Sequence, residues 1–166
     1  MGWMSTSAER PLDSHLCWLL STASHSLLTE LAAALEGVGL SPRAHEVMTA
    51  ALGGEYTQIE LARMVSLDKT TMVNTLDELE AAGLAERRPS PRDRRARVIA
   101  VTEAGRRKVR EADEVIHAVH EDVLGTLPSR EREALLGALR RLVHERLSEP
   151  VETARPVRRR TVRPRK

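Results

Sequence analysis

Two short helices that follow each other almost without a connection constrain the fold of this chain more than any other feature. The string Thr57-Gln58-Ile59-Glu60 has the capping-box pattern, in which the first and fourth side chains satisfy free N–H groups at a helix start. It predicts a short helix that ends near Met64. Residues 65–67 suffice only for a turn, and Asp68 then caps a second helix that Gly83 ends.

Two strand-like segments come directly after this helix pair. They are Leu84–Arg88 and Arg97–Val101, separated by a Pro89-Ser90-Pro91 interruption and a basic loop. From Arg87 to Arg97 the chain carries six arginines and a single acid, Asp93. Two closely joined helices followed by a hairpin describe a winged helix-turn-helix, so the predicted fold class is mostly α with a small β-hairpin wing.

Longer helices flank this segment. Apolar residues at intervals of three and four predict a helix over residues 13–35, and a Ser-Pro pair starts another over residues 41–52. After the hairpin, helices are predicted over residues 102–124 and 129–147. In the last helix the residues predicted to face inward are Leu135, Leu139, Leu142 and Val143. A compact winged lobe cannot cover apolar stripes at both chain ends, so a second copy of the chain is the simplest partner, giving a homodimer.

The distribution of charge indicates a polyanionic partner. The net charge is +2, but residues 155–166 carry seven basic residues and no acid. Without them the remaining 19 basic and 24 acidic residues give the body of the chain a net charge of −5. Positive charge is thus concentrated in this tail and in the loop between the predicted strands, as expected of a protein that binds nucleic acid.

The second helix of the pair and the wing supply the candidate DNA contacts. The start of such a helix can enter a major groove about 12 Å wide, and wing arginines suit a narrow, electronegative minor groove. Asp93 is expected to brace a neighbouring arginine, because a carboxylate facing DNA would oppose binding. The candidate DNA-binding residues are Lys69, Thr70, Thr71, Asn74, Thr75, Arg87, Arg94, Arg95 and Arg97.

The helix pair and the wing resemble the MarR (multiple antibiotic resistance regulator) family of transcription regulators. The resemblance rests on the Leu76–Leu84 block, on Asp93-Arg94-Arg95, and on the Val101–Gly105 string that follows. It implies a dimer with intertwined terminal helices, in which Asp93 braces Arg95 and Arg95 enters the minor groove. Val73 and Asn74 depart from the Thr and Arg that are common in the family, which puts the base preference in doubt.

These features together predict the domain organisation and the function. We expect a disordered lead over residues 1–12, a winged-helix domain over 13–148 and a basic disordered tail over 150–166. Within the domain, the dimerisation helices cover about 13–36 and 103–148, and the DNA-binding lobe covers about 41–102. The expected function is that of a sequence-specific regulator of transcription, a ligand- or oxidant-released repressor that binds a pseudo-palindromic operator on double-stranded DNA as a homodimer. The alternative is a non-catalytic architectural or protein-interaction module that uses the basic wing and tail.

An effector pocket can be predicted between the terminal helices and the lobe. A Trp wall with imidazole donors suits a small aromatic or carboxylate ligand. The candidate lining residues are His15, Trp18, His25 and His45. The alternative is that these side chains serve ordinary packing.

Cys17 offers a second switch. The string Leu16-Cys17-Trp18-Leu19-Leu20 is similar to the hydroperoxide-sensing branch of the family, in which a cysteine near this place is oxidised. That branch has tyrosines that hydrogen-bond the cysteine, whereas here the only tyrosine, Tyr56, follows the second helix. The alternative is a buried cysteine that acts as a small apolar residue.

The sequence gives little indication of metal binding or of enzymatic activity. His117 and His120, with Glu114 and Glu121 beside them, can be interpreted as metal ligands but fit a solvated helix face better, so neither metal nor cofactor is predicted. Because the chain has no Gly-rich phosphate loop and no His-Glu-x-x-His helix, no enzymatic activity is expected. A single cysteine, a start without signal-peptide features and no apolar run of about 18 residues predict a cytoplasmic protein that does not enter a membrane.

Overall fold

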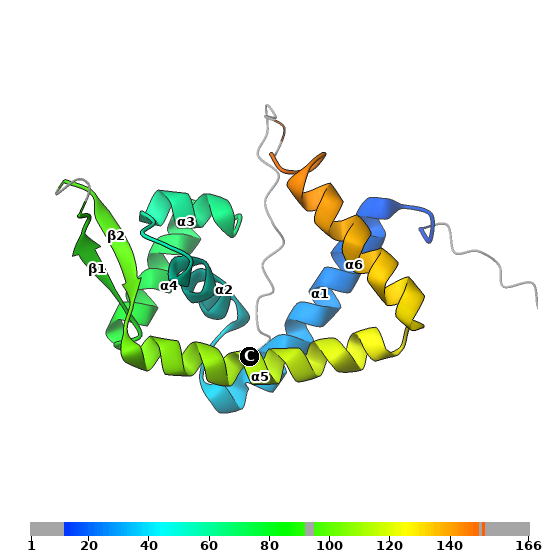
Figure 1. Ribbon diagram of the computed structural model, residues 1–166, viewed down its shortest axis with the longest axis horizontal. Helices are drawn as coiled ribbons and strands as arrows, with labels where there is room; N and C mark the ends of the chain where they lie inside the picture. Colours follow the sequence, from blue (N-terminus) through cyan, green and yellow to red (C-terminus); the bar gives the residue numbers. More distant parts are fainter. Residues whose placement is uncertain (1–11, 92–94, 150, 152–166) are drawn as a thin grey trace, which may run out of the picture. The chain divides into compact units, whose positions relative to one another are not determined.

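The computed structural model describes residues 12–91, 95–149 and 151 of the chain. Their elements are α1 (Leu16–Ala34), the 3-10 helix η1 (Leu35–Val38), α2 (Pro42–Leu52), α3 (Gln58–Met64), α4 (Lys69–Ala81), β1 (Ala85–Pro89), β2 (Arg97–Val101), α5 (Glu103–Gly125) and α6 (Ser129–His144) (Figure 1). The predicted fold class, mostly α with one β-hairpin, is confirmed. The chain divides into two compact units, Met1–Val123 and Leu124–Lys166.

In the first unit α2, α3 and α4 begin and end within a residue or two of their predicted positions, whereas α1 begins at Leu16, three residues after the predicted start at residue 13. Ser41 Oγ accepts a hydrogen bond from the Ala44 N–H at 3.1 Å, and Thr57 forms the complete capping box with Glu60. At the end of α4, Gly83 adopts φ 68°, a left-handed conformation that costs glycine little. Local capping chemistry therefore sets where α2, α3 and α4 begin.

An aliphatic core holds the first unit together where η1, α2, α3, α4, β2 and α5 meet. Its largest fully buried side chains are Leu35, Val47, Met48, Leu61, Met72 and Leu76. Burial of each such side chain stabilises the fold by roughly 1.5–3 kcal/mol. The lobe formed by α2, α3, α4 and the hairpin is thus a single packed body, and α5 leaves it at the foot of the hairpin (Figure 1).

The wing, residues 85–101, is fixed to the start of α3 as well as paired with itself. The two strands are antiparallel, with Ala85 opposite Val101 and Pro89 opposite Arg97. Beyond this ladder the Ile99 N–H donates to the Tyr56 carbonyl at 2.9 Å, next to an isolated bridge between Thr57 and Val98. This third backbone partner was not predicted from the sequence, and it ties the base of the wing to the helix pair.

The joint between the wing and α5 depends on Thr102 and Gly105. The Thr102 hydroxyl donates to the Gly83 carbonyl at 2.8 Å and accepts from the Gly105 N–H at 3.0 Å. Its own N–H donates to the Leu84 carbonyl at 3.0 Å. A Cβ added at Gly105 would lie 2.1 Å from that Leu84 carbonyl oxygen and 2.7 Å from Cγ1 of Val101. The first turn of α5 can therefore approach the wing this closely only with glycine.

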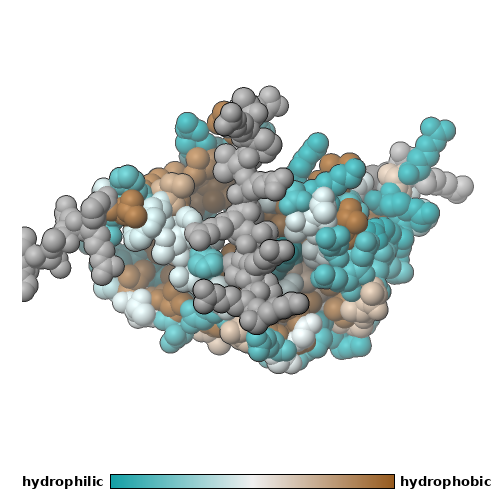
Figure 2. All heavy atoms as spheres, turned by 180° about the vertical axis from the view of Figure 1, so that it is seen from behind, coloured by the Kyte–Doolittle hydropathy of each residue, from teal (hydrophilic) through white to brown (hydrophobic). Residues whose placement is uncertain are grey.

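Many apolar side chains of the terminal helices stay at the surface, where Figure 2 shows apolar patches among hydrophilic residues. In the first unit, Leu16, Leu19 and Leu20 of α1 are 58%, 43% and 37% exposed. In the second unit, α6 has no buried residue. The prediction that Leu135 and Val143 face inward is wrong for the isolated chain, because nothing among the described residues covers them; both are exposed.

Two further predictions can be compared with the structure. The last helix is shorter than predicted and ends at His144, three residues before Leu147. Among the described residues, no helix combines the length and the apolar composition needed to cross a membrane.

Substitution of Gly105 by Ala should destabilise the protein strongly. The new methyl group would overlap a backbone carbonyl, which cannot move as a flexible side chain can, so we expect a loss of about 3 kcal/mol in the free energy of unfolding, measured by urea denaturation. Gly125→Ala is the matched control, because a Cβ there meets no described atom within 4 Å, and it should change stability by less than about 1 kcal/mol. Equal stability of the two variants would contradict the close approach at the joint.

Candidate nucleic-acid interface

A tight turn with one strained residue sets the angle between α3 and α4. The Ser66 N–H donates to the Arg63 carbonyl at 3.2 Å, and the Leu67 N–H donates to the Ala62 carbonyl at 2.8 Å. This is the hydrogen-bond pattern of a Schellman motif, whose left-handed position glycine usually occupies. Here Ser66 occupies it with φ 52°. The chain thus turns within residues 65–68 and starts α4 immediately.

Asp68 caps α4 with both of its carboxylate oxygens. Oδ1 accepts from the Thr71 N–H at 3.0 Å, and Oδ2 accepts from the Thr71 hydroxyl at 2.7 Å. The hydrogen bond from the Thr71 side chain is the main reason why the pKa of Asp68 is lowered, and the backbone N–H of Thr71 adds to it. These hydrogen bonds hold the start of α4 in place. The Thr71 hydroxyl already donates its proton to Asp68, so it has no proton left to donate to a ligand.

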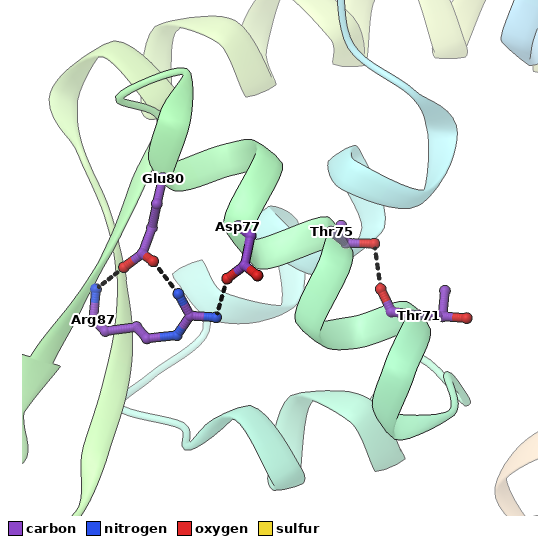
Figure 3. A network of polar contacts seen from close by, with 5 residues as sticks. All are labelled: Thr71, Thr75, Asp77, Glu80 and Arg87. Atoms are coloured by element: carbon purple, nitrogen blue, oxygen red, sulfur yellow. Dashed lines mark hydrogen bonds and ion pairs between the residues drawn. The ribbon is translucent and has the colours of Figure 1, made fainter.

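Three polar side chains at the start of α4 are exposed and have no side-chain partner within the described residues; we call them open. Lys69, Thr70 and Asn74 are exposed, and none of them makes a side-chain hydrogen bond or ion pair within the described residues. Thr75, by contrast, is 4% exposed, and its hydroxyl donates to the Thr71 carbonyl at 2.8 Å (Figure 3). Its predicted role as a DNA contact does not fit this position, because it lies on the helix face that α4 turns to the core.

The arginines of the wing segment divide into two groups. Arg87 is half-buried and bound to Asp77 and Glu80 of α4, and Arg88 is paired with Glu86, so the charge of both is partly compensated within the chain (Figure 3). The predicted DNA contact of Arg87 does not fit this arrangement. Arg95 and Arg97 are exposed. Asp93 and Arg94 lie outside the described residues, as does the basic tail of residues 155–166.

Comparison with known proteins agrees with this geometry. A model of the MarR family matches residues 38–96, which include the helix pair and the first part of the wing. The structure of CouR from Rhodococcus jostii RHA1 bound to p-coumaroyl-CoA is 29% identical, with a TM-score of 0.73, and the match covers 86% of this chain and 99% of that one. A MarR-family transcriptional regulator from Rhodococcus sp. RHA1 is 28% identical, with a TM-score of 0.71 over 78% of this chain and 94% of that one.

Residues 38–96 thus match the MarR family of transcription regulators, and solved structures of that family match most of the chain. A further solved structure, the transcriptional repressor CouR bound to a 23-mer DNA duplex, is 29% identical, with a TM-score of 0.69 over 77% of this chain and 92% of that one. The family resemblance read from the sequence is thereby confirmed.

No hydrogen bond joins the four candidate pocket residues to one another within the described part of the chain. Trp18 and His25 lie on α1, and His15 is the residue directly before it; both histidines are exposed and Trp18 is half-buried. His45 lies on α2, and its Nε2 is 2.7 Å from Asp113 Oδ1 on α5 and 3.4 Å from the Thr49 hydroxyl. Within the described residues, no hydrogen bond connects His45 to the other three side chains. Its partner is thus the carboxylate of α5.

The structure also describes the candidate redox cysteine and the two candidate metal-binding histidines. Cys17 is an exposed free thiol on α1, so the alternative of a buried apolar cysteine is wrong for the isolated chain. His117 and His120 lie on α5, one exposed and one half-buried. In the described part of the chain, no three His, Cys, Asp or Glu side chains gather closely enough to hold a metal ion.

Sequence reasoning missed the carboxylate partners of Arg87. Asp77 and Glu80 stand three residues apart on one face of α4, and both reach Arg87 on β1. The spacing of the two acids was visible in the sequence, but which cation they bind depends on how β1 returns beside α4. Tyr56, whose carbonyl extends the wing sheet, was missed for the same reason.

Replacement of Thr71 by Val should raise the pKa of Asp68 towards its ordinary value, as measured by NMR titration. The folded pKa of Asp68 lies below its unfolded value, so the cap contributes stability above the unfolded pKa and loses it as the pH falls through the folded pKa. The variant should therefore begin to lose this stability at a higher pH than the wild type. In the control Thr70→Val, the backbone N–H remains and the removed hydroxyl has no partner in the described chain, so the pKa of Asp68 should stay low. Equal pKa values in the two variants would refute this account of the cap.

Proposed function

We propose that this transcription regulator is a homodimeric repressor that binds a pseudo-palindromic operator and that a small effector releases it. The observation that carries the proposal is the set of three open polar side chains at the start of α4, namely Lys69, Thr70 and Asn74. The short Thr and Asn side chains suit base edges in the major groove, and Lys69 reaches a phosphate or a guanine. Arg95 and Arg97 of the wing then meet the adjacent minor groove.

The exposed apolar surfaces of both units support the homodimer. The first unit exposes Leu16, Leu19, Leu20 and Leu28 of α1, and the second exposes Leu135, Leu136, Val143 and Leu147 in and beyond α6. Apolar surface of this extent on a soluble regulator is typical of an interface, and a second copy of the chain covers it with two-fold symmetry. Two copies then present their α4 helices to successive major grooves, about 34 Å apart along the duplex.

The effector part of the proposal rests on a relative and on chemistry. CouR, 29% identical to this chain, is known in complex with p-coumaroyl-CoA and, as a transcriptional repressor, with DNA. An aromatic ligand of this kind suits Trp18 of α1, while His45 of α2 is bound to Asp113 and would have to leave it to reach such a ligand. Such a ligand releases the operator only if it binds the DNA-free arrangement of the lobes more tightly than the DNA-bound one.

Selection of duplexes from a random library tests the repressor proposal most directly. The dimer should enrich a pseudo-palindrome of about 16–20 bp whose half-sites are one helical turn apart. The molecular mass of the free protein in solution, measured by light scattering, should be twice that of the chain. Recovery of unrelated sequences, or a monomeric mass, would overturn the proposal and favour an architectural or protein-interaction module.

Substitution of Arg95 by Ala should weaken binding to the selected operator by about 1–3 kcal/mol in a fluorescence-anisotropy titration, because one arginine is lost from the minor groove. The control is Arg107→Ala, which removes the same charge from an exposed site on α5, outside the proposed interface. It should reduce affinity much less. Equal losses in the two variants would mean that general positive charge, and not the wing, drives binding.

A further inference from the structure

A three-residue network joins the recognition helix α4 to the wing. Arg87 Nη2 lies 2.8 Å from Asp77 Oδ1, Arg87 Nη1 is paired with Glu80 Oε2, and the Arg87 backbone N–H donates to Glu80 Oε1 at 2.8 Å. Figure 3 shows the guanidinium spread between the two carboxylates, one turn of α4 apart. We call this set of Asp77, Glu80 and Arg87 the Arg87 clamp.

The clamp has the properties of a positioning device. The side chains of Arg87 and Glu80 are 26% and 32% exposed, so part of the pairing is shielded from water. Glu80 binds both the backbone and the side chain of Arg87, which fixes the strand itself and not only a long side chain. A guanidinium can engage two carboxylates at once through its rigid fork, whereas a lysine ammonium acts as a single point charge.

Covalently, α4 and β1 are joined by residues 82–84 alone. When a helix binds in one groove and a wing in the next, both elements must be positioned to within about half an ångström. A larger error in position loses contacts at one of them. The clamp bridges α4 and β1 beyond their short covalent connection, so it controls the angle between the two DNA-reading elements.

We infer that Asp77, Glu80 and Arg87 determine operator discrimination by fixing the wing to the recognition helix, and that Arg87 does not itself bind DNA. This inference rests on the proposed operator-binding function. Asp77 then has two opposite effects on DNA binding. Its negative charge weakens binding to any duplex, whereas its contact with Arg87 strengthens binding to the correct operator.

The inference can be tested because loss of the Asp77 charge and loss of the Asp77–Arg87 contact should change DNA binding in opposite directions. Asp77 and Glu78 are neighbours on α4 and both are exposed, but Glu78 has no side-chain partner within the described residues. Asp77→Asn and Glu78→Gln therefore remove the same charge, and only the first removes an ion pair of the clamp. Affinities for the selected operator and for a scrambled duplex are measured by fluorescence anisotropy at several salt concentrations, after circular dichroism has verified the folding of each variant.

The clamp predicts different outcomes for the two variants. Asp77→Asn should lower the ratio of operator to scrambled affinity about tenfold, a change within the coupling energies usual for residues in contact. Glu78→Gln should leave that ratio within about twofold and bind both duplexes slightly more tightly, because a negative charge has left the surface near the phosphates. Equal ratios in the two variants would overturn the inference.

Arg87→Lys separates positioning from phosphate binding. If Arg87 contacted a phosphate, lysine would largely replace it, whereas the clamp predicts a loss of discrimination similar to that of Asp77→Asn. The slope of log affinity against log salt should stay that of the wild type, since no phosphate contact is lost. Retained discrimination with lysine would refute the clamp. A wild-type chain that shows no discrimination at all would instead refute the proposed function, so the two failures are distinguishable.

Discussion

The close contact between the first turn of α5 and the Gly83-Leu84 segment, which connects α4 to β1, is the constraint on which the rest of the first unit depends. Gly105 lies against the Leu84 carbonyl, and the Thr102 hydroxyl bridges the Gly83 carbonyl and the Gly105 N–H. This joint closes the hairpin at its open end and starts α5 from a defined point. Val109 and Ala112 of α5 are part of the core. A displacement of the joint would therefore change the packing of the core of the lobe.

The positive charge of the lobe is used in two different ways. Arg87 and Arg88 are paired with carboxylates of their own chain, and they serve the geometry of the wing. Lys69, in contrast, is exposed at the start of α4, and its ammonium group has no side-chain partner within the described residues. A count of basic residues treats all of these cations alike, and only their partners show which of them are available to a phosphate.

The hydrogen bond between His45 and Asp113 gives the lobe a second polar connection to α5. It joins α2 to α5 at a point one residue beyond Ala112, the last fully buried residue of α5. In the proposed mechanism an effector must change how the lobes are held by the terminal helices.

The sequence by itself determined the local structure of this protein. Capping residues such as Ser41, Thr57 and Asp68 act on their own helix starts, so the ends of α2, α3 and α4 could be predicted within a residue or two. The wing and the family signature were equally local, since β1 and β2 are close in the sequence. The order of the elements followed, and with it the candidate DNA-reading surface.

Only the tertiary structure decided which side chains of that surface are free to act. Thr75 shares a helix face with Met72, Leu76 and Leu79, and the packing of that face on the core buries it although its side chain is polar. Arg87 meets Asp77 and Glu80 because β1 folds back beside α4, and Tyr56 reaches the wing across more than forty residues of sequence. Such pairings depend on contacts between distant segments, and patterns of neighbouring residues do not encode them.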